Sequence, residues 1–555
     1  MGAPAVAVRR RSMLGAAAAG LLGAAGCSPR ALDAIEGGYA GVAHARGHLL
    51  REGWPTRAPD VTHQVHTLIA GGGIAGLAAA RALRLAGHDD FALLELEDTA
   101  GGNSRGTELL GIACPLGAHY LPLPGDDARE VQDFLQELGL RRRVAGRWVY
   151  DERHLCHSPQ ERLYFNGQWQ EGLLPLHGVG AATRAQYRRF AALVEQARRA
   201  ARYAIPVQKS AFAPAQLALD AVTFEAWLNA QGLDDAHLRW YLDYCCRDDY
   251  GAGSARVSAW AGLHYFASRH GFHAPGEGDA DDDGGVLTWP QGNDWLAERL
   301  AAPLGERLRT GRVVGRIVHA RHGVAVDALD IPSGRLERWQ ARQVIVALPL
   351  HVAARVLQPL PAALRERADA LRSAPWLVAN IRLRAPLADR PGAAPAWDNV
   401  VYGSAGLGYV DAMHQSLQRQ PGATVLTYYR ALGDMADGRA KLLARPWTHW
   451  RDAMLAELAA PHPDLAAKAL RIEITRHGHA MALPAPGTLS QIGRLRLLDK
   501  RDQLSSKERL PALRWPDAPL LAFAHADWSG YSIFEEAFSL GHAAGAALAR
   551  GQALV

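Results

Sequence analysis

The hydrophobic pattern in the first quarter of the chain predicts a strand, a helix and a second strand. A mainly apolar run over residues 65–70 is typical of a buried strand. Residues 74–86 are almost entirely Ala and Leu, with Arg81 and Arg84 as the polar exceptions, which predicts a helix that ends at Gly87. A short apolar run over residues 91–94 predicts the next strand. Two strands joined by a helix indicate an α/β fold with a parallel sheet.

The pattern changes several times further along the chain. Residues 181–231 have helical periodicity with arginine-rich faces that we interpret as solvated. Strands return after this helical stretch, over residues 313–319, 323–328 and 343–349. Residues 352–480 again alternate strands with helices, and residues 520–545 predict a strand, a glycine-containing turn and a helix. The domain that begins with the strand at residue 65 is therefore expected to be assembled from separated segments.

Three glycines lie at and just after the turn between the first predicted strand and the helix, and their spacing indicates a ligand-binding turn. Gly71, Gly73 and Gly76 occupy the places where a side chain would obstruct the turn, a pyrophosphate and the packing of helix on strand, respectively. Glu95 follows the second strand, 19 residues after Gly76. That offset is close to the ~20 residues at which a carboxylate binds the ribose diol of a dinucleotide. The segment therefore predicts a flavin or nicotinamide dinucleotide site.

The composition limits the number of domains and the kinds of partner, but it indicates no particular reaction. The chain has 555 residues and 48% hydrophobic content, enough for a large core and for two to four domains or lobes. Its 61 basic and 56 acidic residues give a formal charge of only +5. This small excess gives no reason to expect nucleic acid as a partner.

The N-terminus has the features of an export signal. Arg9, Arg10 and Arg11 precede an apolar run over residues 14–26, which is too short to span a bilayer as a permanent helix. The paired arginines resemble a twin-arginine signal, and residues 22–27 resemble a lipoprotein cleavage site that ends at Cys27. We expect a periplasmic protein or a membrane-anchored lipoprotein of a bacterium, attached to the membrane only through a lipidated Cys27; simple cleavage of the signal is the alternative.

No metal site is expected. The cysteines after Cys27 are Cys114, Cys156, Cys245 and Cys246, whose spacing fits neither a zinc nor an iron–sulfur pattern. An acidic stretch over residues 276–285 lacks the bidentate glutamate of a calcium loop.

Taken together, the motifs at the two ends of the chain resemble the flavin-containing amine oxidase superfamily. The resemblance covers almost the whole chain after residue 60. It is carried by the glycine loop with Glu95, the pair Gly101 and Gly102, the segment from Gly117 to Tyr120, Pro290 to Gly292, Val314, residues 344–349, and residues 528–531.

This resemblance implies FAD as cofactor and assigns residues to it. Glu95 would hold the adenosine ribose, Asp527 would lie near the ribityl chain or pyrophosphate, Ser532 would approach the flavin pyrimidine edge, and Tyr531 would form an aromatic wall of the substrate site. The remaining cofactor contacts it implies are Gly71, Gly73, Gly76, Gly101, Gly102, Arg105, Gly117, Ala118, His119 and Val314. Because no cysteine follows Cys246, the FAD is expected to be non-covalent.

The chain departs from the family at the position that matters most for catalysis. Amine-oxidising members carry a lysine that holds a water near flavin N5, in the strand that enters the substrate lobe. Aligned by pattern, the strand at residues 378–383 places Asn380 there, and none of the five lysines falls at this position. An asparagine can orient a water but cannot act as a base. Asn380 and Tyr531 are the candidate catalytic residues.

The expected fold is α/β, with a Rossmann-like FAD-binding domain in discontinuous segments and an inserted α+β substrate lobe that contains a helical subdomain. We expect an export signal over residues 1–30, an extended N-terminal segment over 31–60, FAD-binding segments over 61–125, 281–350 and 491–555, and substrate-lobe segments over 126–280, mostly helical, and 351–490.

The expected activity is oxidation at a C–N bond of a small amine by hydride transfer to flavin, with oxygen or another molecule as electron acceptor. A C–C dehydrogenase of the desaturase or protoporphyrinogen-oxidase kind is the first alternative, and a non-catalytic flavin-binding envelope protein is the second. The residues point to no particular oligomeric state.

Overall fold

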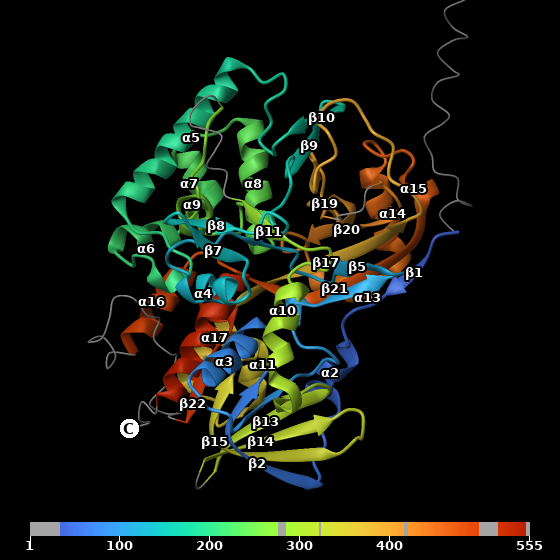
Figure 1. Ribbon diagram of the computed structural model, residues 1–555. Coiled ribbons are helices and arrows are strands. Elements are labelled where there is room, and N and C mark those ends of the chain that lie inside the picture. The colour runs from blue at the N-terminus through green and yellow to red at the C-terminus, as the bar shows by residue number, and fades with distance from the viewer. Residues whose placement is uncertain (1–33, 276–284, 321–322, 416–419, 499–519, 551–555) are drawn as a thin grey trace, which may run out of the picture.

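The computed structural model describes residues 34–275, 285–320, 323–415, 420–498 and 520–550. Two eight-stranded sheets dominate it. In Figure 1 one sheet lies at the bottom, the other at the upper right, and a group of helices fills the upper left. The export signal expected over residues 1–30, Cys27 included, and the acidic stretch at residues 276–284 lie outside the described residues.

The first sheet, here called the nucleotide sheet, begins with the predicted strand–helix–strand unit. β2 pairs in parallel with β3 on one side and with β15 on the other, and β22 adds to β15 from the far end of the chain. Three segments distant in sequence therefore contribute these strands to one sheet, as the interrupted pattern predicted. In spatial order the strands are β12 (Leu308–Arg309), β3 (Phe91–Leu94), β2 (Val61–Ala70), β15 (Leu336–Val346), β14 (Gly323–Asp330), β13 (Arg312–Ala320) and β16 (Leu357–Gln358), with β22 (Leu521–Phe523) paired to β15.

The helix α3 (Ile74–Leu85) packs against α17 (Phe534–Ala549) so closely that only glycine fits at two positions of α17. A Cβ on Gly541 would come within 2.0 Å of the Ala75 carbonyl oxygen, and one on Gly545 within 2.4 Å of the Ala79 carbonyl oxygen. The first and last long helices of the nucleotide domain are thereby held backbone to backbone (Figure 1). The other helices around this sheet are α4 (Arg129–Glu137), α10 (Asp294–Ala301), α11 (Leu350–Val356) and α12 (Ala362–Ala370).

The second sheet is mostly antiparallel and lies above the first. Its longest strands are β17 and β21, which pair with each other, and nearly all of β17 is buried. In spatial order it contains β1 (Glu36–Tyr39), β21 (Ala469–Leu483), β17 (Arg372–Leu383), β20 (Thr424–Ala431), β19 (Gly408–Asp411), β18 (Asp398–Val401), β9 (Glu161–Phe165) and β10 (Gln168–Glu171). The helices α13 (Gly438–Ala444), α14 (Trp447–Leu458) and α15 (Leu465–Lys468) belong to this part of the chain.

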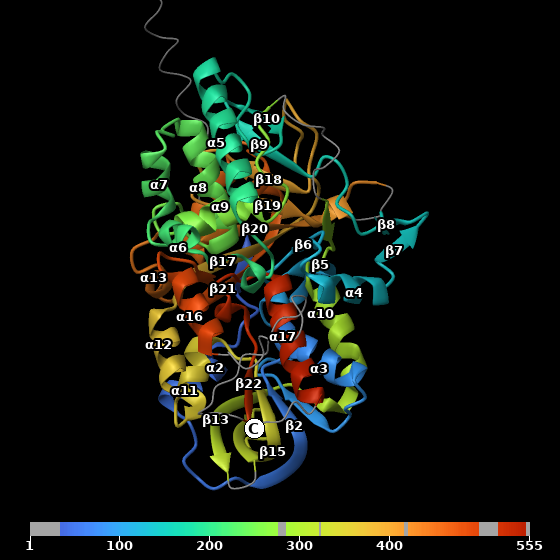
Figure 2. The ribbon, with the colours of Figure 1, turned by 90° about the vertical axis from the view of Figure 1, so that its left-hand side faces the viewer.

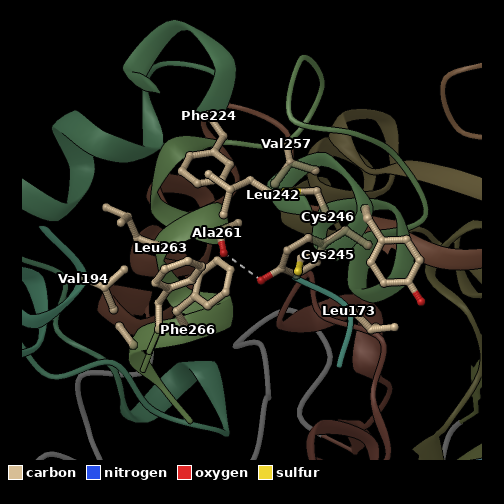
Figure 3. Packing of buried hydrophobic residues seen from close by; sticks show 14 of the residues in the cluster. Leu173, Val194, Phe224, Leu242, Cys245, Cys246, Val257, Ala261, Leu263 and Phe266 are labelled. Atoms are coloured by element: carbon tan, nitrogen blue, oxygen red, sulfur yellow. Dashed lines mark hydrogen bonds between the residues drawn. The ribbon is translucent and has the colours of Figure 1, made fainter. Parts of the chain in front are cut away.

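The helical lobe has its own apolar core. Phe224, Leu242 and Leu263 from three different helices are buried in it, as Figure 3 shows. Cys245 and Cys246 lie in the same core as free thiols, so the two adjacent cysteines form no bridge. The lobe consists of α5 (Ala181–Ala200), α6 (Pro214–Asp220), α7 (Phe224–Ala230), α8 (Ala236–Tyr250) and α9 (Ala259–Ala267), and α16 (Thr488–Leu498) lies against α6.

The segment before the first predicted strand is more ordered than expected. Residues 31–60 were expected to be extended, but β1 joins the edge of the second sheet, and the helix α2 (His44–Glu52) then leads down to the nucleotide sheet. Figure 2 shows α2 beside α11, between the two sheets. Three two-stranded sheets complete the fold: β4 (Gly106–Leu109) with β5 (Ile112–Pro115), β6 (Tyr120–Pro122) with β11 (Val286–Thr288), and β7 (Arg141–Val144) with β8 (Arg147–Tyr150).

Among the described residues, the structure contains neither a helix long and apolar enough to cross a membrane nor a cluster of metal-ligating side chains.

Candidate active site

One cavity of about 680 Å³ lies where the nucleotide sheet, the second sheet and the helical lobe meet. Its wall includes the glycine loop at residues 71–73, the segment 117–120, the end of α8, residues 476–481 of β21 and the start of α17. Segments from both ends of the chain therefore face the same space.

The glycine loop meets the requirements that its spacing predicted. Gly71 has φ +105°, in the region that favours glycine, and a Cβ on Gly76 would lie 1.9 Å from the Gly71 carbonyl oxygen. Gly73 is different, because a Cβ there would approach only the Gly102 Cα, at 3.9 Å, and the residue borders the cavity. Gly71 and Gly76 are thus needed for the turn and the helix packing, whereas Gly73 leaves room on the cavity side.

Glu95 is fixed at the edge of this cradle by backbone donors. The amides of Gly72 and Glu97 each donate to one of its carboxylate oxygens, both at 2.8 Å. Burial raises the pKa of Glu95, and these two hydrogen bonds act in the opposite direction. The carboxylate lines the cavity and retains lone pairs for further donors, as a ribose diol requires.

A second glycine pair and the segment after it form the opposite wall of the cradle. Gly101 and Gly102 both have positive φ and lie against Gly73. A Cβ on Gly117 would lie 2.2 Å from the Asn103 carbonyl oxygen, so only glycine fits at this position. Gly117, Ala118 and His119 all line the cavity, as do Val314 and Ser532, whose hydroxyl accepts the Ala482 amide at 2.8 Å.

Four residues assigned to the cofactor are not among the residues that line the cavity: Gly76, which is needed for the helix packing, Tyr531, Arg105 and Asp527. The guanidinium of Arg105 donates to the Gly41 carbonyl at 2.8 Å and pairs with Glu97 at 3.4 Å. The carboxylate of Asp527 accepts the Leu350 amide at 2.9 Å and lies beside His525. Both side chains therefore hold the loops that form the wall, because their polar groups are used by neighbouring backbone and side chains.

Neither candidate catalytic residue lines the cavity. The buried amide of Asn380 donates to the Pro115 carbonyl at 2.9 Å and accepts the Thr427 hydroxyl at 2.8 Å, so it is used to join β17 to its neighbours. On the same strand, Trp376 and Val378 reach the cavity instead. Within the described residues no lysine lines the cavity.

The hydroxyl of Tyr531 is buried and donates to Asp249, while Arg269 donates to that same hydroxyl. Tyr531 therefore does not present its ring as a cavity wall. It instead positions the Asp249–Arg269 pair, which does line the cavity.

The helical lobe closes the cavity with a group of charged residues that we call the acidic chamber: Asp248 and Asp249 at the end of α8, Arg269 after α9, and Glu535 at the start of α17. Arg269 donates to both carboxylate oxygens of Asp249, at 3.0 and 3.3 Å, so these two charges balance. Burial raises the pKa of Asp248 to about 7, and the neighbouring Asp249 charge adds to the effect. Burial also raises the pKa of Glu535 to about 7.

Aromatic rings line the space next to the acidic chamber. His119 stacks on Tyr429 with ring centroids 4.3 Å apart, and Tyr120 lies edge-on to His119 at 4.9 Å. Burial lowers the pKa of His119 to about 3, so its imidazole is neutral at physiological pH. Trp376 and Val378 add further apolar surface. The walls around the chamber are thus aromatic and uncharged.

Another flank of the cavity is basic. The side chains of His44 and Arg51 on α2 line it together with Arg355 and Arg439, from α11 and α13. The segment before residue 60, in which the sequence indicated no chemistry, therefore contributes part of the wall.

The acidic chamber was not predicted from the sequence. Its only local signal is the pair Asp248 and Asp249 near the end of a helix, and adjacent acidic residues are usual on solvated helix faces. Arg269 follows Asp249 by 20 residues, 269 minus 249, and Glu535 lies near the end of the chain, and nothing about the neighbours of either residue sets it apart.

The cradle fits FAD. The loop before α3 leaves open space at Gly73, the helix start supplies unpaired amide groups and the positive end of its dipole, and Glu95 offers acceptor oxygens. These residues would hold the pyrophosphate and the adenosine ribose. None of the described cysteines lines the cavity, in keeping with a non-covalent flavin.

Comparison with known proteins agrees with this geometry. The family model described as flavin-containing amine oxidoreductase matches residues 74–445. A putrescine oxidase bound to putrescine has a TM-score of 0.64 at 18% identity, with 88% of this chain and 99% of the other covered. Cyclohexylamine oxidase from Brevibacterium oxydans has 0.60 at 18% identity, with 88% and 99% covered. A fatty acid isomerase from P. acnes has 0.56 at 15% identity, with 86% and 97% covered. No curated protein sequence matches the chain.

The solved structures establish the fold, and the family model matches more than half of the chain. The protein therefore belongs to the flavin-containing amine oxidoreductase family and is an FAD-dependent oxidoreductase.

Proposed function

We propose that the protein oxidises a C–N bond of a small amine and is exported from a bacterial cell. The observation that carries the first part is the continuity of the cavity, which runs from the dinucleotide cradle at residues 71–73 to the acidic chamber with its aromatic walls. Putrescine oxidase and cyclohexylamine oxidase, which share the fold, are named for amine substrates.

In this reaction the carbon next to nitrogen loses a hydride and the nitrogen becomes part of an imine, which water hydrolyses to a carbonyl compound and an amine or ammonia. FAD, when bound, supplies the two-electron acceptor for that hydride, and oxygen or another molecule then takes the electrons. The nitrogen must be neutral, since its lone pair supports the developing C=N bond. His119 is uncharged at physiological pH and so does not place a cation beside that nitrogen.

The described residues contribute position and exclusion of water. Tyr120, Tyr429 and Trp376 provide flat apolar surfaces against which an alkyl or aryl amine can be held. Tyr531 and Arg269 fix Asp249 from two sides. The chamber is thereby preorganised, and its polar groups need little rearrangement when a substrate binds.

Anaerobic reduction of the enzyme-bound flavin tests the proposal. The purified yellow protein is mixed without oxygen with primary amines, diamines, amino acids and polyamines, and the loss of the visible absorbance of the oxidised flavin is followed. Bleaching by amines supports the proposal. Bleaching by unsaturated or porphyrinogen-type substrates, with none by amines, contradicts it.

The second candidate, a C–C dehydrogenase, is favoured by one observation. Among the described residues that line the cavity, the strand β17 contributes Trp376 and Val378, and no lysine is present. A reaction at carbon needs an apolar wall and no amine-directed base. The same bleaching experiment separates the two candidates, because each predicts a different class of reductant.

Export is proposed from the sequence of residues 1–30 alone. Replacing Arg9, Arg10 and Arg11 with lysine should keep the protein in the cytoplasm if the twin-arginine signal is used. Cys27→Ser should release the exported protein from the membrane fraction if Cys27 is lipidated. Unchanged fractionation of both variants would contradict this part of the proposal.

A further inference from the structure

The hairpin formed by β7 (Arg141–Val144) and β8 (Arg147–Tyr150) projects from the body of the molecule, as Figure 2 shows at its right-hand edge. Within the described residues its two strands pair only with each other. The turn residues Ala145 and Gly146 have φ +48° and +84°, the two positive values that a tight two-residue hairpin requires. With no third strand beside it, the hairpin leaves most of its side chains uncovered.

Large apolar side chains are exposed on this hairpin. The exposed fractions are 46% for Val144, 44% for Trp148 and 37% for Val149. These are three of the six large apolar side chains that are exposed in the described part of the chain, although residues 141–150 are only ten positions. Single exposed apolar residues are ordinary, but their concentration on one projecting element indicates an interaction surface.

The same hairpin is strongly basic. Residues 141–150 contain four arginines and no acidic residue. Arg142, Arg143 and Arg147 are exposed, and none of the three forms an ion pair with a described residue. Asp151, the acidic residue next to the hairpin, is paired with Arg153 instead. The positive charges of the hairpin are therefore available to an anionic partner.

Basic and apolar side chains lie together on both faces of the hairpin, because directly opposite residues project to the same side. Arg142 lies opposite Val149 on one face. Arg143 lies opposite Trp148 on the other face. A flat protein partner would contact only one of these faces, whereas the headgroup region of a bilayer surrounds an element that enters it. The distribution therefore favours a membrane over a protein surface.

Contacts at the base and at the turn hold the hairpin in this arrangement. The buried guanidinium of Arg141 donates to the side chain of Gln132 on α4 at 3.0 Å and lies 3.9 Å from the centroid of the Trp148 ring. The guanidinium of Arg143 donates to the Gly146 carbonyl at 3.3 Å. The exposed tryptophan is thus held in place on the surface, which lowers the entropy cost of inserting it into another phase.

We propose that the β7–β8 hairpin inserts into the headgroup region of a membrane that contains anionic phospholipids. Trp148, Val144 and Val149 enter the boundary between headgroups and acyl chains, where tryptophan is enriched in membrane proteins. The arginines beside them bind lipid phosphates, and binding of this kind combines buried apolar area with attraction to anionic lipid. The hairpin lies in the interface and does not span the bilayer. The inference is independent of the proposed amine oxidation, and the contact is additional to any attachment through Cys27.

Binding to lipid vesicles tests the proposal. Full-length holoenzyme carrying Cys27→Ser, to which no acyl chain is attached, is mixed with vesicles of phosphatidylcholine alone or with about one third phosphatidylglycerol, and the bound fraction is measured by sedimentation. Residues 1–30 are the same in every protein compared, so only differences between the proteins are interpreted.

Two triple variants remove the same charge at different places. In the first, the three exposed arginines of the hairpin are replaced: Arg142→Gln, Arg143→Gln and Arg147→Gln. In the matched control, three exposed arginines of α5 are replaced: Arg184→Gln, Arg188→Gln and Arg189→Gln. Trp148→Ala removes the largest apolar side chain of the hairpin. The Tm and the visible spectrum of the bound flavin show that each variant is folded.

The unaltered hairpin should bind vesicles with phosphatidylglycerol at least about tenfold more tightly than phosphatidylcholine alone, and high salt should remove most of this difference by screening the charges. The hairpin triple variant should bind roughly 100-fold more weakly, since each basic residue near an anionic surface is worth about fivefold. The α5 triple variant should stay within about threefold of the unaltered protein, because its charges lie away from the contact. Trp148→Ala should bind roughly tenfold more weakly.

A fluorescent label at the tip reports on the hairpin itself. Ala145→Cys carries a polarity-sensitive fluorophore in a background with Cys27→Ser and Cys156→Ser, because the other described cysteines are buried. The control label is at Ala230→Cys, an exposed residue of α7, and α7 lies on the opposite side of the molecule in Figure 2. Vesicles with phosphatidylglycerol should shift the emission of the label at residue 145 to shorter wavelength and leave that at residue 230 unchanged.

The proposal is overturned if no vesicle binds the protein, or if the two triple variants weaken binding equally, because overall charge alone would then explain the attraction. Charge-dependent binding without a change in emission at residue 145 would also overturn it, and would indicate an acidic protein surface as the partner of the hairpin. Loss of binding in the hairpin triple variant alone, together with the emission shift at residue 145, is the result that supports it.

Discussion

Replacement of Asp248 by Asn should stabilise the protein at alkaline pH. The pKa of Asp248 is about 7 in the folded chain, against an ordinary value of 3.8. Below pH 4 the carboxyl is protonated in both the folded and the unfolded chain and carries no penalty. As the pH rises from 4 to 7, the unfolded chain releases the proton first, so the folded chain loses stability, and the loss is complete above pH 7.

The magnitude follows from the difference between these two pKa values. It corresponds to about 4 kcal/mol, since each pKa unit is worth about 1.4 kcal/mol. Asp248 is partly accessible from a cavity that water can enter, and we therefore expect about half of this, roughly 2 kcal/mol, to be recovered in Asp248→Asn. Because the chain has 555 residues, the corresponding rise in Tm is a few degrees at most.

Thermal unfolding of the holoenzyme and of Asp248→Asn, recorded from pH 5 to pH 8.5, measures this effect. The difference in Tm between the two proteins should grow as the pH rises. Burial raises the pKa of Glu535 to about 7 and that of Glu536 to about 8, so both proteins should lose stability over the same range, and only the difference between them reports Asp248. A constant difference, or a variant less stable at pH 8.5, would refute the reasoning.

Three further predictions concern the fold and the cradle. Gly541→Leu should lower the Tm strongly or prevent folding, because its Cβ would lie 2.0 Å from the Ala75 carbonyl oxygen. The control Gly125→Ala should leave the Tm unchanged, because a Cβ at Gly125 has nothing within 4 Å. A well-folded Gly541→Leu would contradict the close approach of the two helices. Glu95→Ala should reduce FAD affinity at least about tenfold, measured as flavin retained on gel filtration, and full retention would rule out its role in the cradle. Asn380→Ala should lower the free energy of unfolding by about 1–3 kcal/mol, because two buried hydrogen bonds are lost. The rate of flavin reduction by amines should stay within a few-fold of that of the unaltered protein. A large loss of this rate at unchanged Tm would show that Asn380 is a catalytic residue.

The substrate lobe shows why only the structure could tell which side chains of a strand reach the cavity. The sequence predicted the strand that contains Asn380, and β17 is present. Which residue of a strand reaches a cavity depends on where the neighbouring chain covers it. Here Pro115 and Thr427 occupy the amide of Asn380, and the cavity opens instead at Val378 and Trp376.

The sequence by itself determined the dinucleotide cradle. Gly71, Gly73, Gly76 and Glu95 lie within 25 consecutive residues, counted inclusively from 71 to 95, and their positions are set by the geometry of one strand–turn–helix–strand unit. Steric requirements of this kind involve residues that are close in sequence, so the sequence alone shows them. The interrupted hydrophobic pattern likewise predicted that distant segments would complete the sheet.

Only the tertiary structure decided the substrate end of the site. Asp248, Arg269 and Glu535 come from elements separated by up to 287 residues, 535 minus 248, and no local pattern links them. Tyr531 was expected as a cavity wall, but its hydroxyl is used by Asp249 and Arg269. Packing between segments decides whether a polar side chain forms a hydrogen bond with a neighbouring residue or remains free to bind a ligand. The pattern of residues along one chain does not contain that information.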